Sequence, residues 1–229
     1  MKKFFILPLC VLLVLSFSCC TGEKTSESEP TAVNSQEEIE TGIIPNDVDE
    51  NSEDAINVKA TVANYLDTFI SCDFDAIKAI LHEDDTWFFN FESEDQLAFY
   101  EAIFPRIEYK FDYVSEHKGV YGVMTEITSP DMAEVYGTII TDYIDSTTGA
   151  NNKTHAEILN ESTEKMLELI KSPDIKKRVS SLYVYVEYID GNYIPRCDPY
   201  LANELTGGAP ETSDEIQSSL NEAINALSE

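Results

Sequence analysis

Apolar side chains recur at three- and four-residue spacing after position 52, and this period predicts amphipathic helices. The longest stripe follows Ser52, a residue type that often caps a helix, and predicts a helix over 53–71. Asp73 and Ser93 are expected to cap two shorter helices, and Pro105 to end the second of them. The positions expected to face inward from the first helix are Ile56, Ala60, Ala63, Leu66, Phe69 and Ile70.

A pattern of period two replaces the helical one after position 106 and predicts half-buried antiparallel strands. The return strand is expected over 120–128, and a third long strand over 179–189. A final strand is expected from Tyr193, and Pro195 places it at the edge of the sheet, where a missing N–H is tolerated. The residues that alternate with polar positions, and are expected on one face of the first strand, are Ile107, Tyr109, Phe111 and Tyr113.

Two helices are predicted between the second and third long strands. Pro130 is suited to the first turn of a helix, where no backbone N–H is needed. Thr154 with Glu157 forms a capping-box pattern for the next helix, which Pro173 ends. Strands and helices in this order predict an α+β domain with a helical pair inserted over about 130–171.

The domain is expected to span 52–208 and to close at the Gly207-Gly208 pair. Residues 209–229 are interpreted as a linker and a short amphipathic helix, with Thr212 and Glu215 as its capping box. An isolated helix of this length is marginal in water, so we expect a surface to pack on it. That surface is either the domain itself or a partner.

The first twenty residues have the pattern of an export signal. Lys2 and Lys3 precede an apolar run of fourteen residues, which is shorter than the ~20 that span a bilayer. The run ends in Ser18, Cys19 and Cys20, and this end resembles the signal of bacterial lipoproteins. The resemblance implies a signal peptide over 1–18 and a lipid on Cys19, with Cys20 as the alternative. Two or three acyl chains there would anchor the protein stably to the extracytoplasmic side of the cell membrane.

The segment 19–51 is expected to be a disordered acidic tether, because its few apolar residues cannot offset the entropy of ordering. The stretch from Glu23 to Asp54, which covers most of this segment and the next three residues, holds eleven acids and one base. The whole chain has a net charge of −28, which disfavours nucleic acid as a partner, since binding to phosphates rests on lysine and arginine. The same charge leaves the lipid anchor as the expected contact with an anionic membrane. A spacer is favoured for this segment over an acidic recognition tail.

Candidate chemistry is sparse. The three histidines, His82, His117 and His155, lie far apart in the sequence, and no CxxC pair supports a zinc site. The loop at 82–85 joins one histidine to three acids, but neighbouring residues rarely converge on one cation. We therefore expect no metal and no cofactor. Whether Cys72 and Cys197 form a disulfide is left open, although export would permit one.

Several stretches together resemble the nuclear-transport-factor-2-like (cystatin-related) cone fold. More narrowly, they resemble a family of uncharacterised bacterial lipoproteins with that fold. The resemblance covers roughly 53–208 and implies a curved antiparallel sheet wrapped on the N-terminal helices. It is carried by Tyr65-Leu66-Asp67, Cys72-Asp73-Phe74-Asp75-Ala76-Ile77-Lys78, Thr125-Glu126-Ile127-Thr128-Ser129-Pro130-Asp131-Met132, and the stretch from Val184 to Ile194.

Proteins of this fold include both enzymes and binding domains, so the fold alone does not determine function. An enzyme of the family would need an Asp or His base beside a tyrosine inside the cone, and Tyr109 and Tyr113 are the candidates. No paired acid is evident, and we expect both to be core aromatic residues and the protein not to be an enzyme. The expected function is binding of a small ligand or a protein partner; the alternatives are an isomerase- or hydrolase-type enzyme and a protein-interaction module.

Overall fold

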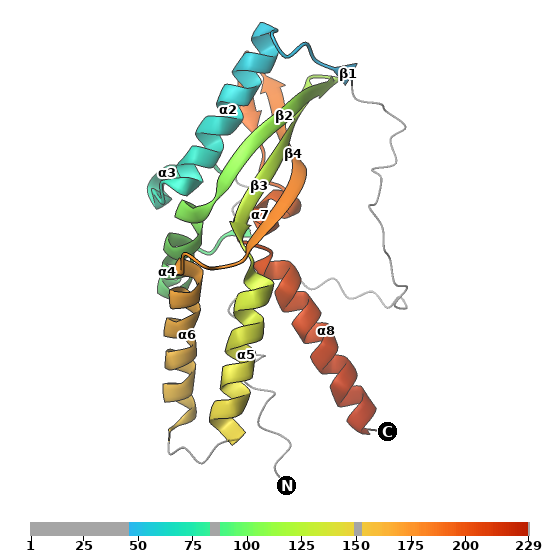
Figure 1. Ribbon diagram of the computed structural model, residues 1–229. Helices are drawn as coiled ribbons and strands as arrows, with labels where there is room; N and C mark the ends of the chain where they lie inside the picture. The colour runs from blue at the N-terminus through green and yellow to red at the C-terminus, as the bar shows by residue number, and fades with distance from the viewer. Residues whose placement is uncertain (1–45, 83–87, 149–152, 229) are drawn as a thin grey trace.

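The structure, a computed structural model, describes residues 46–82, 88–148 and 153–228 (Figure 1). The predicted signal peptide, the lipidation candidates Cys19 and Cys20 and the tether up to position 45 lie outside the described residues. None of the described helices combines the length and apolar character needed to cross a membrane. The elements in chain order are β1 (Asn46–Asp47), α2 (Glu53–Ile70), α3 (Phe74–Ile80), α4 (Glu94–Ile103), a 3-10 turn (Phe104–Arg106), β2 (Glu108–His117), β3 (Val120–Pro130), α5 (Met132–Thr148), α6 (His155–Lys171), β4 (Lys177–Ile189), β5 (Asn192–Pro195), α7 (Pro199–Leu205) and α8 (Ala209–Ser228).

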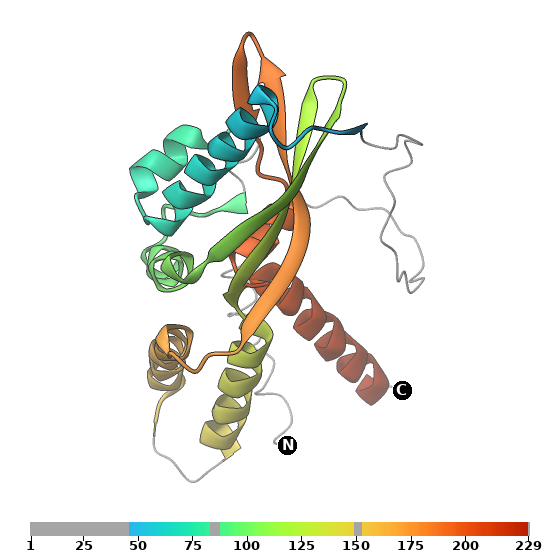
Figure 2. The same ribbon diagram turned by 45° about the horizontal axis from the view of Figure 1, so that its top comes forward.

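The strands form one antiparallel sheet in the order β1-β2-β3-β4-β5, which is curved and does not close into a barrel. The predicted α+β class with a curved antiparallel sheet is therefore confirmed. In Figures 1 and 2, α2, α3 and α4 cover one face of this sheet, and we call that face the inner face. The predicted helical pair, α5 and α6, extends from the end of the sheet opposite the hairpins. The short β5 lies at the edge, as Pro195 predicted.

Side-chain caps fix where the helices begin. Ser52, Asp73 and Ser93 each accept a hydrogen bond from the backbone N–H three residues later. Thr154 and Glu157 form the reciprocal capping box that opens α6. Each cap satisfies backbone donors that the first turn of a helix leaves free, so the local sequence determines these boundaries.

The buried face of α2 differs in part from the predicted one: Leu66 and Phe69 are fully buried as predicted, but the first half of the helix is rotated. Ala55, Val58 and Val62 are fully buried against the inner face, whereas Ile56 is 57% exposed and Ala60 is exposed. The apolar residues of this helix form two overlapping stripes, and the sheet packs on the one that carries the two valines. Ile56 therefore remains as an exposed hydrophobic residue near the start of α2.

A β-bulge in β2 reverses the predicted direction of Tyr113. Phe111 pairs with Thr125 and Val114 with Val123, so two residues of β2 lie opposite one residue of β3. The extra residue returns Val114 to the inner face and moves Tyr113 to the outer face. The prediction that Tyr113 shares a face with Tyr109 was therefore wrong.

The last residues assigned to the tether belong to the folded domain. β1 pairs with β2, and the N–H of Val48 donates to the carbonyl of Val114 at 3.0 Å. The Glu50 carboxylate accepts from the N–H of Val114 at 3.1 Å and pairs with Lys59. This contact satisfies a backbone donor that the bulge leaves without a strand partner.

The C-terminal helix starts directly after the glycine pair, so the expected linker after position 208 is instead the first turn of α8. The carbonyl of Gly207 accepts from the N–H of Met132 at 3.0 Å. Arg178 of β4 binds both oxygens of Glu204 at 2.9 Å and reaches Glu211 of α8 at 2.8 Å. α8 also contacts α5 and α7, and Ala209, Thr212 and Ser213 are buried, so its first turns dock on its own domain.

Candidate binding surface

The inner face of the sheet is filled by side chains. One cluster of buried residues joins α2, α4 and the inner face, and its aromatic residues pack directly on one another. The rings of Tyr100 and Phe104 stack with centroids 5.0 Å apart, and Phe69 meets Phe104 edge-on at 5.5 Å. These residues are 0–3% exposed. The position of a ligand cavity in a hollow cone is therefore occupied by apolar core.

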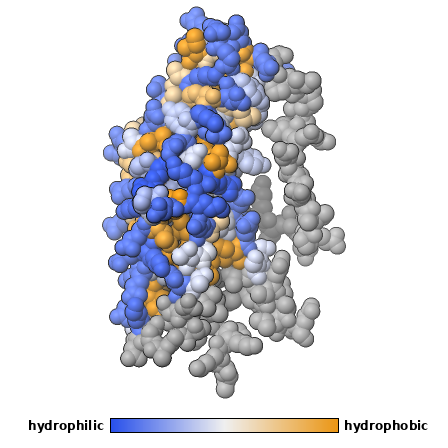
Figure 3. All heavy atoms as spheres, viewed as in Figure 1, coloured by the Kyte–Doolittle hydropathy of each residue, from blue (hydrophilic) through white to orange (hydrophobic). Residues whose placement is uncertain are grey.

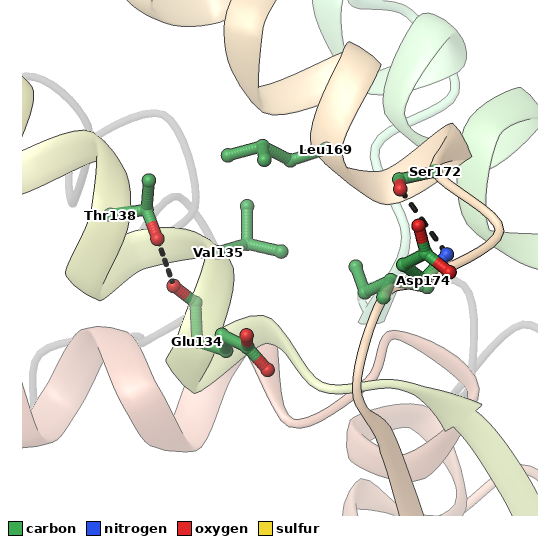
Figure 4. Close-up of a pocket in the computed structure, with 7 residues that line it drawn as sticks. Glu134, Val135, Thr138, Leu169, Ser172 and Asp174 are labelled. Atoms are coloured by element: carbon green, nitrogen blue, oxygen red, sulfur yellow. Dashed lines mark hydrogen bonds between the residues drawn. The ribbon is translucent and has the colours of Figure 1, made fainter.

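A small cavity lies elsewhere, between α5, the end of α6 and the segment after it (Figure 4). Its volume is about 100 Å³, well below the ~300–1,000 Å³ of ordinary small-molecule pockets. Its hydroxyl groups already have partners: Thr138 donates to the carbonyl of Glu134, and Ser172 accepts from the N–H of Asp174. The residues that line it are Glu134, Val135, Thr138, Leu169, Ser172, Asp174 and Ile175. Such a cavity suits a few water molecules better than a substrate.

The structure does not bring the two candidate tyrosines together. The hydroxyl of Tyr109 donates to Asp67 of α2 at 2.9 Å, and burial, followed by this contact, raises the pKa of Tyr109 to about 12. On the outer face, the hydroxyls of Tyr113 and Tyr183 lie 2.5 Å apart and share a hydrogen bond. Burial, and then that bond, raises the pKa of Tyr183 to about 12. Tyr109 and Tyr183 therefore stay protonated near pH 7 and act as neutral hydrogen-bonding groups.

The other candidates remain apart as well. His82 follows α3, His117 ends β2 and His155 begins α6, while acids 83–85 lie outside the described residues. Within the part of the chain that the structure describes, no three His, Cys, Asp or Glu side chains are grouped to hold a metal ion. Cys72 and Cys197, whose pairing the sequence left open, do not form a disulfide with each other.

A different set of residues lies at the end of the sheet where both hairpins turn. Tyr121 of β3, Tyr188 of β4 and Tyr193 of β5 share the inner face of the sheet beside the first turn of α2, and we call these three residues the tyrosine rim. Tyr188 pairs with Tyr193 across the strands, with ring centroids 4.8 Å apart, and Tyr193 meets Tyr121 edge-on at 5.6 Å. Tyr188 is 50% exposed. Figure 2 shows both hairpins beside the N-terminal end of α2.

Two carboxylates accompany the tyrosine rim. Asp54, in the first turn of α2, accepts a hydrogen bond from the hydroxyl of Tyr193 at 2.7 Å, and Glu116 lies opposite Tyr121 on β2. That hydrogen bond, and then burial, raises the pKa of Tyr193. Burial, followed by the charges of Asp54 and Glu116, raises the pKa of Tyr121. Among the described residues, neither carboxylate forms an ion pair with a lysine or arginine.

The sequence held a partial signal for this surface. The period-two pattern of the strand expected over 179–189 predicts Tyr188 on the same face as Val184 and Val186, and the strand register confirms that face. Its exposure, 50%, depends on how the elements pack around the hairpin end, which the strand pattern does not encode. Elsewhere, as Figure 3 shows in the view of Figure 1, hydrophobic residues are scattered among hydrophilic ones on the visible face.

Comparison of the chain with known protein families, with curated proteins and with solved structures gave no match. The resemblance to cone-fold lipoproteins therefore stays a prediction from the residues that carry it.

Proposed function

We propose that this protein is a bacterial lipoprotein, held by a lipid on Cys19 at the extracytoplasmic side of the cell membrane, whose domain binds a protein partner. The observation that favours a partner over an enclosed small ligand is the filled inner face of the sheet. A site for a macromolecule must then lie on the surface, and the tyrosine rim places the half-exposed Tyr188 there, beside the partly buried Tyr121 and Tyr193. Aromatic residues of this kind are enriched at protein interfaces.

The negative charge supports the role assigned to the lipid. Removal of residues 1–18 takes away Lys2 and Lys3 and changes the net charge from −28 to −30. A surface of this charge is repelled by anionic lipid, with a range of roughly one Debye length, ~8–10 Å at physiological salt. The acyl chains, and not the domain, then hold the protein at the membrane.

Fatty-acid labelling tests the anchor. Cells that express the wild-type protein are expected to incorporate a labelled fatty acid into it, and Cys19→Ala is expected to abolish the label. Cys20→Ala is the matched control and is expected to keep it. Loss of label from Cys20→Ala alone would assign the lipid to Cys20, and label on both variants would refute the anchor.

Site-specific crosslinking tests the surface. A photoreactive phenylalanine analogue in place of Tyr188 is expected to crosslink a protein partner in intact cells. The same analogue at Tyr200, a tyrosine of α7 that is 73% exposed, provides the control position. Crosslinks from both positions, or from neither, would argue against a partner at the tyrosine rim.

One observation favours a second candidate, an isomerase- or hydrolase-type enzyme. Asp67 lies within hydrogen-bond distance of Tyr109, which is the pairing such an enzyme needs. The Asp67 side chain is exposed on α2, and neither residue lines the cavity of Figure 4. We therefore place this candidate second.

A further inference from the structure

The tyrosine rim presents an aromatic face to solvent from one side only. Tyr188 rests on Tyr193, and Tyr193 rests on Tyr121, so the rings support one another and leave the outer part of Tyr188 free. Ring centroids 4.8 and 5.6 Å apart leave no space between the rings for a ligand. A partner group must therefore lie on the rim and not inside it.

The charge of this surface selects for a cation. The face of an aromatic ring carries negative electrostatic potential and attracts ammonium and guanidinium groups. The hydroxyl of Tyr193 donates a hydrogen bond to Asp54, and this bond increases the electron density of the Tyr193 ring. Asp54 and Glu116 add two negative charges without a lysine or arginine partner among the described residues.

The open shape distinguishes between cations. A small quaternary ammonium ion is held best when aromatic rings surround it, which these packed rings do not allow. A guanidinium is planar, stacks flat on one ring and donates several N–H bonds to a carboxylate in the same plane. A lysine ammonium is a compact, strongly hydrated charge and gains less from a single open ring.

We infer that the tyrosine rim binds an arginine-bearing segment of a polypeptide partner, with a guanidinium stacked on Tyr188 and paired with Asp54 or Glu116. This inference rests on the proposed partner-binding function and adds the chemistry of the partner. The contact is one-sided and half-exposed, so a single guanidinium adds a modest increment. Several arginines along the segment, or a larger interface around them, supply the remaining affinity.

A peptide series tests the inference on the full-length lipidated protein in a nonionic detergent. The probe is a fluorescent twelve-residue peptide with four arginines in a Gly/Ser background. Two matched peptides carry lysine or citrulline, the uncharged analogue of arginine, at the same positions. Fluorescence anisotropy at two salt concentrations is expected to rank the peptides arginine, lysine and citrulline, in order of decreasing affinity.

Variants distinguish binding at the tyrosine rim from nonspecific electrostatic attraction to an acidic protein. Tyr188→Ala is expected to weaken the arginine peptide roughly five- to tenfold, the size of a half-exposed cation–π contact, and Tyr188→Phe to leave binding intact. Asp54→Asn is expected to weaken binding, whereas the charge-matched Asp214→Asn, at an exposed acid of α8, and Tyr200→Ala are not. Circular dichroism of each variant checks that it is folded.

Equal affinity for the arginine and citrulline peptides, or equal losses in Asp54→Asn and Asp214→Asn, would overturn the inference. The proposed function fails on a different result, the absence of a specific crosslink from Tyr188 in cells. A specific crosslink together with a failed peptide series would keep the partner and exclude the arginine chemistry.

Discussion

The substitution Gly207→Ala is expected to destabilise the domain severely. Gly207 has φ of +66°, in the left-handed region that costs an L-residue about 1–2 kcal/mol. A Cβ at this position would lie 2.1 Å from the carbonyl oxygen of Pro130, closer than any real contact. Neither side can move freely, because Pro130 pairs with Lys177 in the sheet and Gly207 accepts a hydrogen bond from Met132.

The expected loss in the free energy of unfolding is the sum of these contributions. Relief of the clash needs a backbone shift that breaks the bond to Met132, which adds about 1–1.5 kcal/mol to the cost of the left-handed conformation. With residual strain, we expect a loss of about 3–5 kcal/mol, among the largest for a single substitution. Urea denaturation followed by circular dichroism measures it, and for a domain of this size each kcal/mol lowers Tm by roughly 2–4 °C.

Gly119→Ala is the matched control. Gly119 has φ of +82° in the β2–β3 turn, but no atom lies within 4 Å of the position of an added Cβ. It should lose only the conformational cost, about 1–2 kcal/mol. Equal losses in the two variants would refute the close contact between Gly207 and Pro130, and with it the way in which the glycine pair joins α7 and α8 to the sheet.

Three further predictions concern charged and ionisable groups. Arg178→Met leaves the carboxylate of Glu204, whose side chain is 10% exposed, without its cation, and is expected to cost about 2–3 kcal/mol; Lys177→Met removes an exposed pair with Glu108 and should cost under about 0.5 kcal/mol in the same urea titration. The hydrogen bond from Lys59 lowers the pKa of Glu50. The stability that this carboxylate provides is therefore present above its unfolded pKa, near 4.5, and is lost as the pH falls through the lowered value. Glu50→Gln should flatten the pH dependence of Tm below pH 5, and an unchanged curve would contradict the contact. Burial, and then the charge of Glu101, raises the pKa of Cys72 to about 11. Iodoacetamide at pH 8 should therefore alkylate Cys72 roughly 100-fold more slowly than an unperturbed thiol, as measured by mass spectrometry of the native protein. Reaction at the rate of an unperturbed thiol would contradict the raised pKa.

Patterns within short stretches of sequence predicted the helices and strands, whereas the errors in side-chain orientation arose where distant segments pair. The caps at Ser52, Asp73 and Ser93 use contacts within one turn, so the sequence contains all of the information they need. The bulge opposite Met124 depends on how β2 and β3 align over their whole length, and no residue type in β2 marks it. Tyr113 was misplaced for that reason.

The surface was harder to predict than the fold. On α2, the stripe with Ile56 and the stripe with Val58 fit a helix equally well, and only the position of the sheet decides between them. The exposure of Tyr188 likewise depends on tertiary packing and not on the pattern of its strand. Asp54 and Tyr193 are 139 residues apart in the chain, so their hydrogen bond is a product of the tertiary fold.

The position of β1 has a mechanical consequence. Asn46 pairs with Glu116, and Glu116 pairs in turn with Tyr121, so the point where the chain enters the domain lies two strands from the tyrosine rim. Adjacent strands are about 4.8 Å apart. For the anchor and the partner proposed above, the path of a pulling force between them therefore crosses β1, β2 and β3 at the hairpin end of the sheet. The helices α5 and α6, at the opposite end of the sheet, lie outside this path.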